Sequence, residues 1–344
     1  MSKIRLNKTN RVNFATYGMV ILAYVVLQVM GNVGMLSSTM KGQLVPICAY
    51  IVMAVSLNLT VGILGELSLG HAGFMSVGAF TGIVVTTTLA DLIPAAPVRL
   101  IIAMIAGGLM AGLMGVIVGV PVLRLKGDYL AIVTLAFGQI IMNIVNVLYI
   151  GLDENGLHFS LLEQKFQLGE GGKMIINGPI GVSGVSKLSN FTMGFALVLV
   201  TLLLTLNLLH SRTGRAVMAV RDNAIAAESI GISIMRYKLL TFVVSAVFAG
   251  MAGTLYAMNY STVTAAKFDF NTSILVLVFV VLGGLGNIWG SIIAAALLTV
   301  LPELLRAVND YRMLLYAILL IVMMLFNNSK LKERLFASRH KEVD

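Results

Sequence analysis

Long apolar runs, separated by short polar segments, are the feature that most constrains how this chain can fold. Of its 344 residues, 58% are hydrophobic and only 11% are charged, whereas a soluble domain carries about 25% charged residues. A chain without a solvated shell needs lipid as its surroundings, and a run of roughly 20 apolar residues is long enough to cross a bilayer as a helix. We therefore predict a polytopic, all-α integral membrane protein.

The apolar runs predict a bundle of about ten transmembrane helices, with eight as the lower limit. The expected spans are 14–36, 44–63, 67–90, 98–120, 129–150, 191–209, 239–260, 271–285, 290–308 and 313–327. The first run follows four basic residues, as in a signal peptide, but it is longer than the apolar part of one, so we expect it to be retained. Glycines at 62, 65 and 70 predict discontinuous helices between the second and third runs.

Loop charges predict the orientation of the chain. The N-terminal segment 1–13, the loop 210–238 and the tail 328–344 each carry an excess of basic residues, whereas the loop 151–190 carries an excess of acidic ones. Because loops on the cytoplasmic side are enriched in Lys and Arg, we expect both termini and 210–238 inside and 151–190 outside. A topology of ten spans over residues 14–327 agrees with the sign of the net charge in all four segments.

Small residues predict how the helices pack. Three G-x-x-x-G pairs occur within the apolar runs, namely Gly78 with Gly82, Gly108 with Gly112, and Gly115 with Gly119. Such spacing lets two helix backbones approach closely in lipid. We therefore expect a tight bundle.

Motifs for catalysis, metal binding and nucleotide binding are missing from the sequence. The nearest approach to a phosphate-binding loop, at Gly172 and Lys173, lacks the first glycine and the following Ser or Thr. The four His are far apart, and Cys48 is the only cysteine. We predict no catalytic residue, no metal site and no enzyme. The net charge of +9 lies at the termini and in loops, so we do not expect nucleic-acid binding.

Ionisable residues within the predicted spans are scarce. Glu66 and His71 lie in the glycine-broken stretch, and Glu303 lies with Arg306 near a helix end. Ion-coupled carriers usually place such groups deep in the membrane, where each is costly and is kept for function. Glu66 is either a helix cap at the membrane surface or an ion-coupling group. The scarcity favours a passive path that is driven by another component.

A second set of polar residues is a candidate translocation path. Its members are Asn58, Glu66, Ser68, His71, Gln139, Asn143 and Asn146. The last three occur at i, i+4 and i+7, on one face of the fifth predicted span, and we expect that face to point into the bundle because exposing amides to lipid is costly. The alternative is that these groups form hydrogen bonds between helices.

The loop 210–238 predicts a short amphipathic helix at the cytoplasmic face. Between Gly214 and Gly231, small and apolar residues recur at helical spacing, with charged residues interleaved among them. Such a helix could lie on anionic lipid through its arginines. It could also be a docking element for another protein.

Four blocks of the sequence resemble branched-chain amino acid ABC transporter permeases of the LivM type. The segment 212–231 resembles the cytoplasmic coupling loop of that family, and the blocks 56–80, 122–141 and 283–298 follow the family's order. Family members often have Gln where Glu66 stands, which weakens any ion-coupling role for Glu66. The resemblance implies ATPase-coupling roles for Arg212, Gly214, Arg215, Arg221, Asp222, Ala226, Ala227, Glu228 and Gly231.

The resemblance also implies an assembly. The chain would be a membrane subunit of a bacterial ABC importer in the inner membrane, paired with a homologous LivH-like permease and supplied by an extracytoplasmic substrate-binding protein. Two ABC ATPase subunits would use ATP, and this chain would bind no cofactor. Two alternatives stay open: a permease of the same superfamily for urea, amides or a sugar, and an ion-coupled carrier or channel. The resemblance also implies that the specificity for the substrate rests largely with the binding protein and not with this chain.

Overall fold

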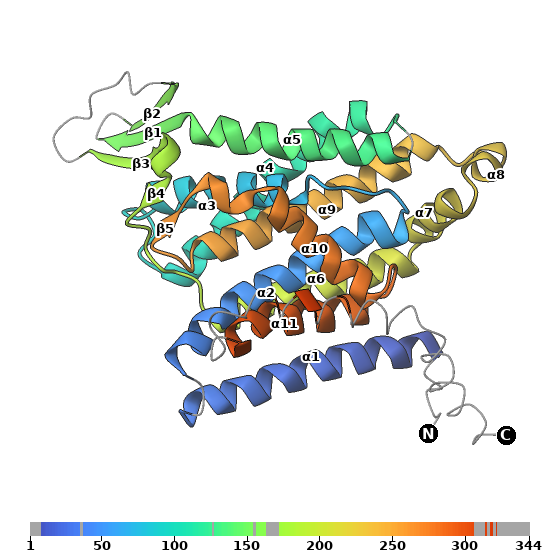
Figure 1. Ribbon diagram of the computed structural model, residues 1–344, viewed down its shortest axis with the longest axis horizontal. Helices are drawn as coiled ribbons and strands as arrows, with labels where there is room; N and C mark the ends of the chain where they lie inside the picture. The colour runs from blue at the N-terminus through green and yellow to red at the C-terminus, as the bar shows by residue number, and fades with distance from the viewer. Residues whose placement is uncertain are drawn as a thin grey trace.

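A computed structural model describes residues 8–34, 37–125, 127–153, 156–162 and 172–305, together with positions 314, 317, 318 and 321. For residues 8–16 and Asp128 only the backbone is described. Apart from positions 314, 317, 318 and 321, the predicted tenth span, Arg306 and the tail 328–344 lie outside the described residues. Figure 1 shows the long helices running side by side between two ends of the molecule.

Helices occupy the first nine predicted spans. They are α1 (Lys8–Asn32), α2 (Ser38–Asn58) with the π-helix η1 (Leu59–Ile63), α3 (His71–Thr88), α4 (Ala96–Val122), α5 (Asp128–Asn146), α6 (Phe191–His210), α9 (Ile234–Ala257), α10 (Phe270–Gly283) and α11 (Ile288–Leu304). Six helical segments of the described part are long and apolar enough to cross a membrane, and two shorter apolar helices accompany them. The prediction of a polytopic helical membrane protein is confirmed.

One end of the bundle carries β-strands. Strands β1 (Leu148–Asp153), β2 (Gly156–Leu161) and β3 (Lys173–Asn177) form an antiparallel sheet in the order β2-β1-β3. The 3-10 turn η2 (Gly178–Ile180) leads to β4 (Val182–Ser183), which pairs with β5 (Thr262–Val263). The turn η3 (Ala265–Phe268) follows β5. We call this the sheet end; α7 (Arg212–Asp222) and α8 (Ala224–Ser229) lie at the opposite end, the α7–α8 end (Figure 1).

The sheet corrects one boundary. The fifth span ends at Asn146, where we expected it to continue to position 150. Residues 147–152 are almost all apolar, so hydropathy extends the helix into what is strand β1. A short apolar run cannot be assigned to helix or strand by periodicity alone.

Glycines bring α3, α4 and α9 into backbone contact. A Cβ on Gly78 would lie 2.1 Å from the carbonyl oxygen of Gly250, and one on Gly107 would lie 2.8 Å from the carbonyl oxygen of Gly78. Thr254 Oγ1 donates a hydrogen bond to that same Gly78 oxygen at 2.8 Å. Gly82 faces Thr254, and the paired glycines 108, 112, 115 and 119 of α4 all face side chains of α9. The predicted tight packing is confirmed.

The predicted discontinuity between the second and third spans is also confirmed. The helix α2 widens into the π-helix η1, residues 64–70 are not helical, and α3 begins at His71. Gly62 is needed here because its Cβ would lie 2.2 Å from the backbone nitrogen of Gly286. Gly65 turns the chain with a φ of +81°, a conformation that favours glycine. We call residues 64–70 the α2–α3 break.

Replacing Gly250 with Leu is expected to destabilise the bundle. The new Cβ would lie 2.5 Å from Ala111 Cβ and 2.6 Å from the carbonyl oxygen of Gly107, so α4 and α9 must separate. We expect a loss of about 3 kcal/mol, at the upper end for overpacking, measured by thermal unfolding in detergent. Gly42→Ala is the control, because nothing lies within 4 Å of its Cβ. Equal melting temperatures for the two variants would contradict this account.

Candidate functional site

The α7–α8 end contains two short helices where we expected one. Ser211 caps α7, its Oγ accepting from the backbone N–H of Gly214 at 3.1 Å. The helix stops at Asn223, which is extended (φ −156°, ψ 100°) and caps α8 by accepting from the N–H of Ala226 at 3.0 Å. The expectation of a single amphipathic helix is therefore wrong. Asn side chains compete with helical hydrogen bonds, and Asn223 uses its own to begin a new helix.

Helix α7 is amphipathic, as predicted for this loop. Val217 and Val220 of α7 are buried against the bundle. Among the predicted ATPase-coupling residues, Gly214 and Ala227 are buried, whereas Arg212, Arg215, Arg221, Asp222, Ala226, Glu228 and Gly231 are exposed. The structure thus brings the predicted coupling residues together on one hairpin of helices, with their charges facing outward.

Two large apolar side chains of this segment are exposed. Ile225 is 82% exposed and Ile230 is 75% exposed, beside the exposed Ala226. Figure 1 shows α8 projecting past the ends of the long helices. Isolated exposed apolar residues are common, but neighbouring ones on a projecting element are typical of a contact with a partner. Spacing from the buried Ala227 would have placed Ile225 on the outer face of α8.

The hairpin is connected to the α2–α3 break. Arg221 Nη1 donates to the carbonyl oxygen of Gly62 at 3.3 Å, and the aliphatic part of the Arg221 side chain covers Gly65. Lys238 of α9 forms an ion pair with Glu66, and both side chains are about 15% exposed. Of the two roles considered for Glu66, its position at this end, paired with a lysine, fits the end of a helix better than an ion-coupling site.

Three predicted path residues lie inside the bundle. Asn58 is fully buried; its Nδ2 donates to Ser291 Oγ at 3.0 Å and its Oδ1 accepts from the Gly286 N–H at 2.9 Å. His71 Nε2 shares a hydrogen bond of 2.8 Å with Ser56 Oγ. Ser68 is buried and its Oγ has no hydrogen-bond partner among the described residues. Asn58 and His71 thus make the interhelical contacts of the alternative interpretation, and their place on a path stays a prediction.

The amides of α5 do not share the inner face of that helix. Its buried positions are Leu130, Ala131, Thr134, Gly138, Ile141 and Val145, which follow one helical face. Asn143 is exposed on the opposite side, and Gln139 and Asn146 are half-buried between the two faces. The expectation that this stripe points into the bundle is therefore wrong for Asn143.

Close approach of backbones explains the orientation of α5. A Cβ on Gly73 of α3 would lie 2.9 Å from Gly138 Cα, and Thr134 Oγ1 accepts from the Leu69 N–H at 3.0 Å. Only the small residues of α5 fit this contact. Polarity alone predicted the wrong face because steric fit, and not the cost of exposing amides, decides which side packs inward.

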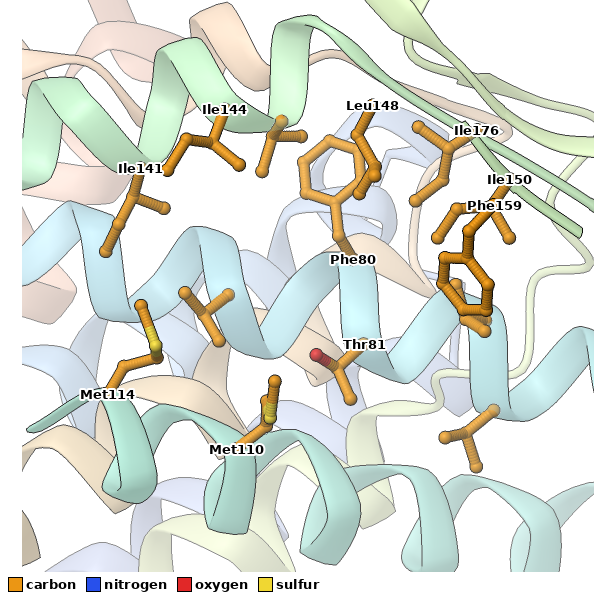
Figure 2. A pocket seen from close by; sticks show the side chains of 14 residues that line it. Phe80, Thr81, Met110, Met114, Ile141, Ile144, Leu148, Ile150, Phe159 and Ile176 are labelled. Atoms are coloured by element: carbon orange, nitrogen blue, oxygen red, sulfur yellow. The ribbon is translucent and has the colours of Figure 1, made fainter. Parts of the chain in front are cut away.

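A cavity of about 350 Å³ lies between α3, α4, α5 and the strands β1 to β3. Figure 2 shows the side chains that line it. Thr81 supplies its only polar side chain; Phe80, Met110, Met114 and Phe159 are among the apolar ones. A zwitterion would lose its hydration there without gaining hydrogen bonds. A second cavity, of about 450 Å³, lies between α2, α9, α10 and α11 and includes three tyrosines, Gln43 and Asn271, which suits a small solute with polar and apolar parts.

The family model described as "Branched-chain amino acid transport system / permease component" matches residues 39–325, which include both sides of the α2–α3 break and the α7–α8 hairpin. The chain belongs to this family. It is a multi-pass membrane protein, as its apolar helices and its family agree.

Three relatives show how the similarity is distributed. The chain is 37% identical over 295 residues to the high-affinity branched-chain amino acid transport system permease protein LivM of Escherichia coli (strain K12), covering 80% of this chain and 66% of that protein. It is 33% identical over 129 residues to LivH of Salmonella typhimurium, covering 37% and 42%. It is 27% identical over 222 residues to the nucleoside ABC transporter permease protein NupC of Lactococcus lactis, covering 60% and 64%.

The match therefore spans just under two thirds of the length of LivM. No solved structure matches the chain. Within the part of the chain that the structure describes, no group of three or more His, Cys, Asp or Glu residues could hold a metal ion.

Replacing Asn58 with Ala should lower stability, whereas replacing Asn143 with Ala should not. The first change removes two interhelical hydrogen bonds and leaves the Gly286 N–H without its acceptor, and such bonds contribute about 0.6 kcal/mol each, up to about 1.7. Thermal unfolding in the same detergent compares the two variants. If Asn143→Ala were the more destabilised of the two variants, α5 would pack inward by its amide face, which would contradict this prediction.

Proposed function

We propose that this chain is the membrane-spanning permease subunit of an ATP-binding cassette importer that carries branched-chain or related amino acids. The observation that carries the proposal is the α7–α8 hairpin, which presents exposed isoleucines and charges to a partner and is connected to the α2–α3 break. Membership of the family and the similarity to LivM support the choice of solute. The chain itself binds no cofactor, and two ATPase subunits supply the energy.

The α7–α8 end faces the cytoplasm of a bacterium, and the sheet end faces outward from the inner membrane. The basic loop 210–238 supports this orientation through the positive-inside rule. Both termini then lie in the cytoplasm, the ATPase subunits dock on α7 and α8, and an extracytoplasmic binding protein delivers the amino acid to the sheet end.

A homologous LivH-like permease covers the amide face of α5. Asn143 is exposed on a membrane helix, with Gln139 and Asn146 half-exposed beside it, and amides exposed to lipid are unfavourable. A second permease subunit removes this cost by enclosing a polar path between the two chains. The remaining surface of the bundle, rich in exposed Leu, Ile and Val, contacts lipid.

Other functions fit the structure less well. The similarity to NupC supports a permease for another small solute, but LivM is more similar, over more of the chain. An ion-coupled carrier needs an ionisable group on the path, whereas Glu66 is paired with Lys238 beside α7.

Co-purification and uptake test the proposal. Expressed with its companion permease and ATPase subunits, the chain should purify as one complex, and vesicles containing this complex and the binding protein should accumulate leucine only with ATP. The variant Ile225→Asp should lose the ATPase subunits and keep the companion permease, because it places a charge on the apolar docking surface. Leucine uptake by the chain alone, driven by an ion gradient, would refute the proposal.

Replacing Gly231 with Ala should reduce the ATP hydrolysis that the loaded binding protein stimulates. Gly231 follows α8 with a φ of +87°, and its N–H donates to the Glu228 carbonyl oxygen, so a side chain strains the turn that holds α8. We expect a loss of about fivefold, within the range for strain of roughly 1 kcal/mol. Gly184→Ala is a matched control at the sheet end, with a φ of +76° and the same open space. An equal loss in both variants would count against a role for the turn.

A further inference from the structure

The loop 210–238 contacts η1 and the α2–α3 break at two points that lie on either side of α8. Arg221 extends from the last turn of α7 to the carbonyl oxygen of Gly62, and Lys238 extends from the second turn of α9 to Glu66. Gly62 and Glu66 in turn lie on either side of Gly65, the turning point of the break. The chain is therefore attached on both sides of α8, at the end of α7 and at the start of α9.

Each contact has features that hold it in one geometry. Arg221 Nε and Nη2 both donate to Asp222 Oδ1, at 3.0 and 2.9 Å, which leaves Nη1 directed at Gly62. The Glu66 and Lys238 side chains are largely removed from solvent. A largely buried ion pair resists separation, because breaking it leaves two charges without partners.

The break passes a displacement on to several helices. Gly62 belongs to the π-helical end of α2 and lies against Gly286, in the turn between α10 and α11. The Glu66 N–H donates to the Thr60 carbonyl oxygen, which ties the break back to the same π-helix. On the other side, the Leu69 N–H donates to Thr134 of α5, and α3 begins two residues later. A shift of the break must therefore move α2, α3 and α5 together.

We propose that Gly62, Glu66, Arg221 and Lys238 form a latch that transmits movement of the docked hairpin to α2 and α3, and that Glu66 and Lys238 are positioning residues for transport. The inference rests on the proposed function, since it assigns a route for energy that the ATPase subunits supply. It gives Glu66 a role in coupling to ATP hydrolysis, in place of contact with the solute or with a driving ion.

The test uses the assembled transporter in vesicles, with the loaded binding protein, and measures leucine uptake per ATP hydrolysed. Lys238→Met and Glu66→Met should each lower this ratio by about tenfold, the upper part of the range for residues that carry coupling between sites. The exchanged pair Glu66→Lys with Lys238→Glu should restore most of it, because the attraction is re-formed with the charges reversed. Arg236→Met, an exposed basic residue two positions before Lys238, is the control and should keep the wild-type ratio.

Thermal unfolding of each assembled complex distinguishes a latch, which transmits movement, from a contact that only stabilises the complex. An exchanged pair that regains the wild-type melting temperature but not the uptake per ATP would overturn the inference, as would single variants with an unchanged ratio. If either single variant fails to assemble, the exchanged pair decides alone through the same two measurements. A wild-type chain that never purifies with ATPase subunits refutes the proposed function itself, which is a different result.

Discussion

Close backbone contact between helices is the constraint on which the rest of this structure depends. In lipid, apolar side chains gain nothing by leaving their surroundings, so helices associate through packing and interhelical hydrogen bonds. The contacts of Gly78, Gly107 and Gly250 place α3, α4 and α9 together at the centre. With that centre in place, Gly73 and Gly138 hold α5 on α3, and the orientation of α5 decides where its amides point.

Several polar contacts join elements that are far apart in the sequence. Asn58 bonds to Ser291 and Gly286, Arg221 bonds to Gly62, and Glu66 pairs with Lys238. The centre relies on glycine packing, and there Thr254 bonds the carbonyl oxygen of Gly78.

Much of the helical layout could be predicted from the sequence, because a bilayer requires long apolar segments and nine of those segments are helices. The strand β1 could not be predicted, since Leu148–Asp153 continues the apolar run of α5 without a turn residue between them. Likewise, the amide stripe of α5 pointed to the wrong face, because the fit of Gly138 against Gly73 depends on a neighbour 65 positions away. The coupling residues were predicted together, but the contacts of Arg221 with Gly62 and of Lys238 with Glu66 depend on the tertiary structure, which no local pattern records.

The π-helical end of α2 has a consequence for the direction of everything that follows it. A π-turn contains more residues than an α-turn, so Leu59–Ile63 rotates the exit of the chain relative to an uninterrupted α-helix. Each residue of an α-helix corresponds to roughly 100° of rotation, so one residue more or fewer in this segment would turn Glu66 away from Lys238. The number of residues in η1, and not only their types, therefore sets the orientation in which the bundle contacts the α7–α8 hairpin. Insertions and deletions there would misalign the latch residues, although every one of their side chains would still be present.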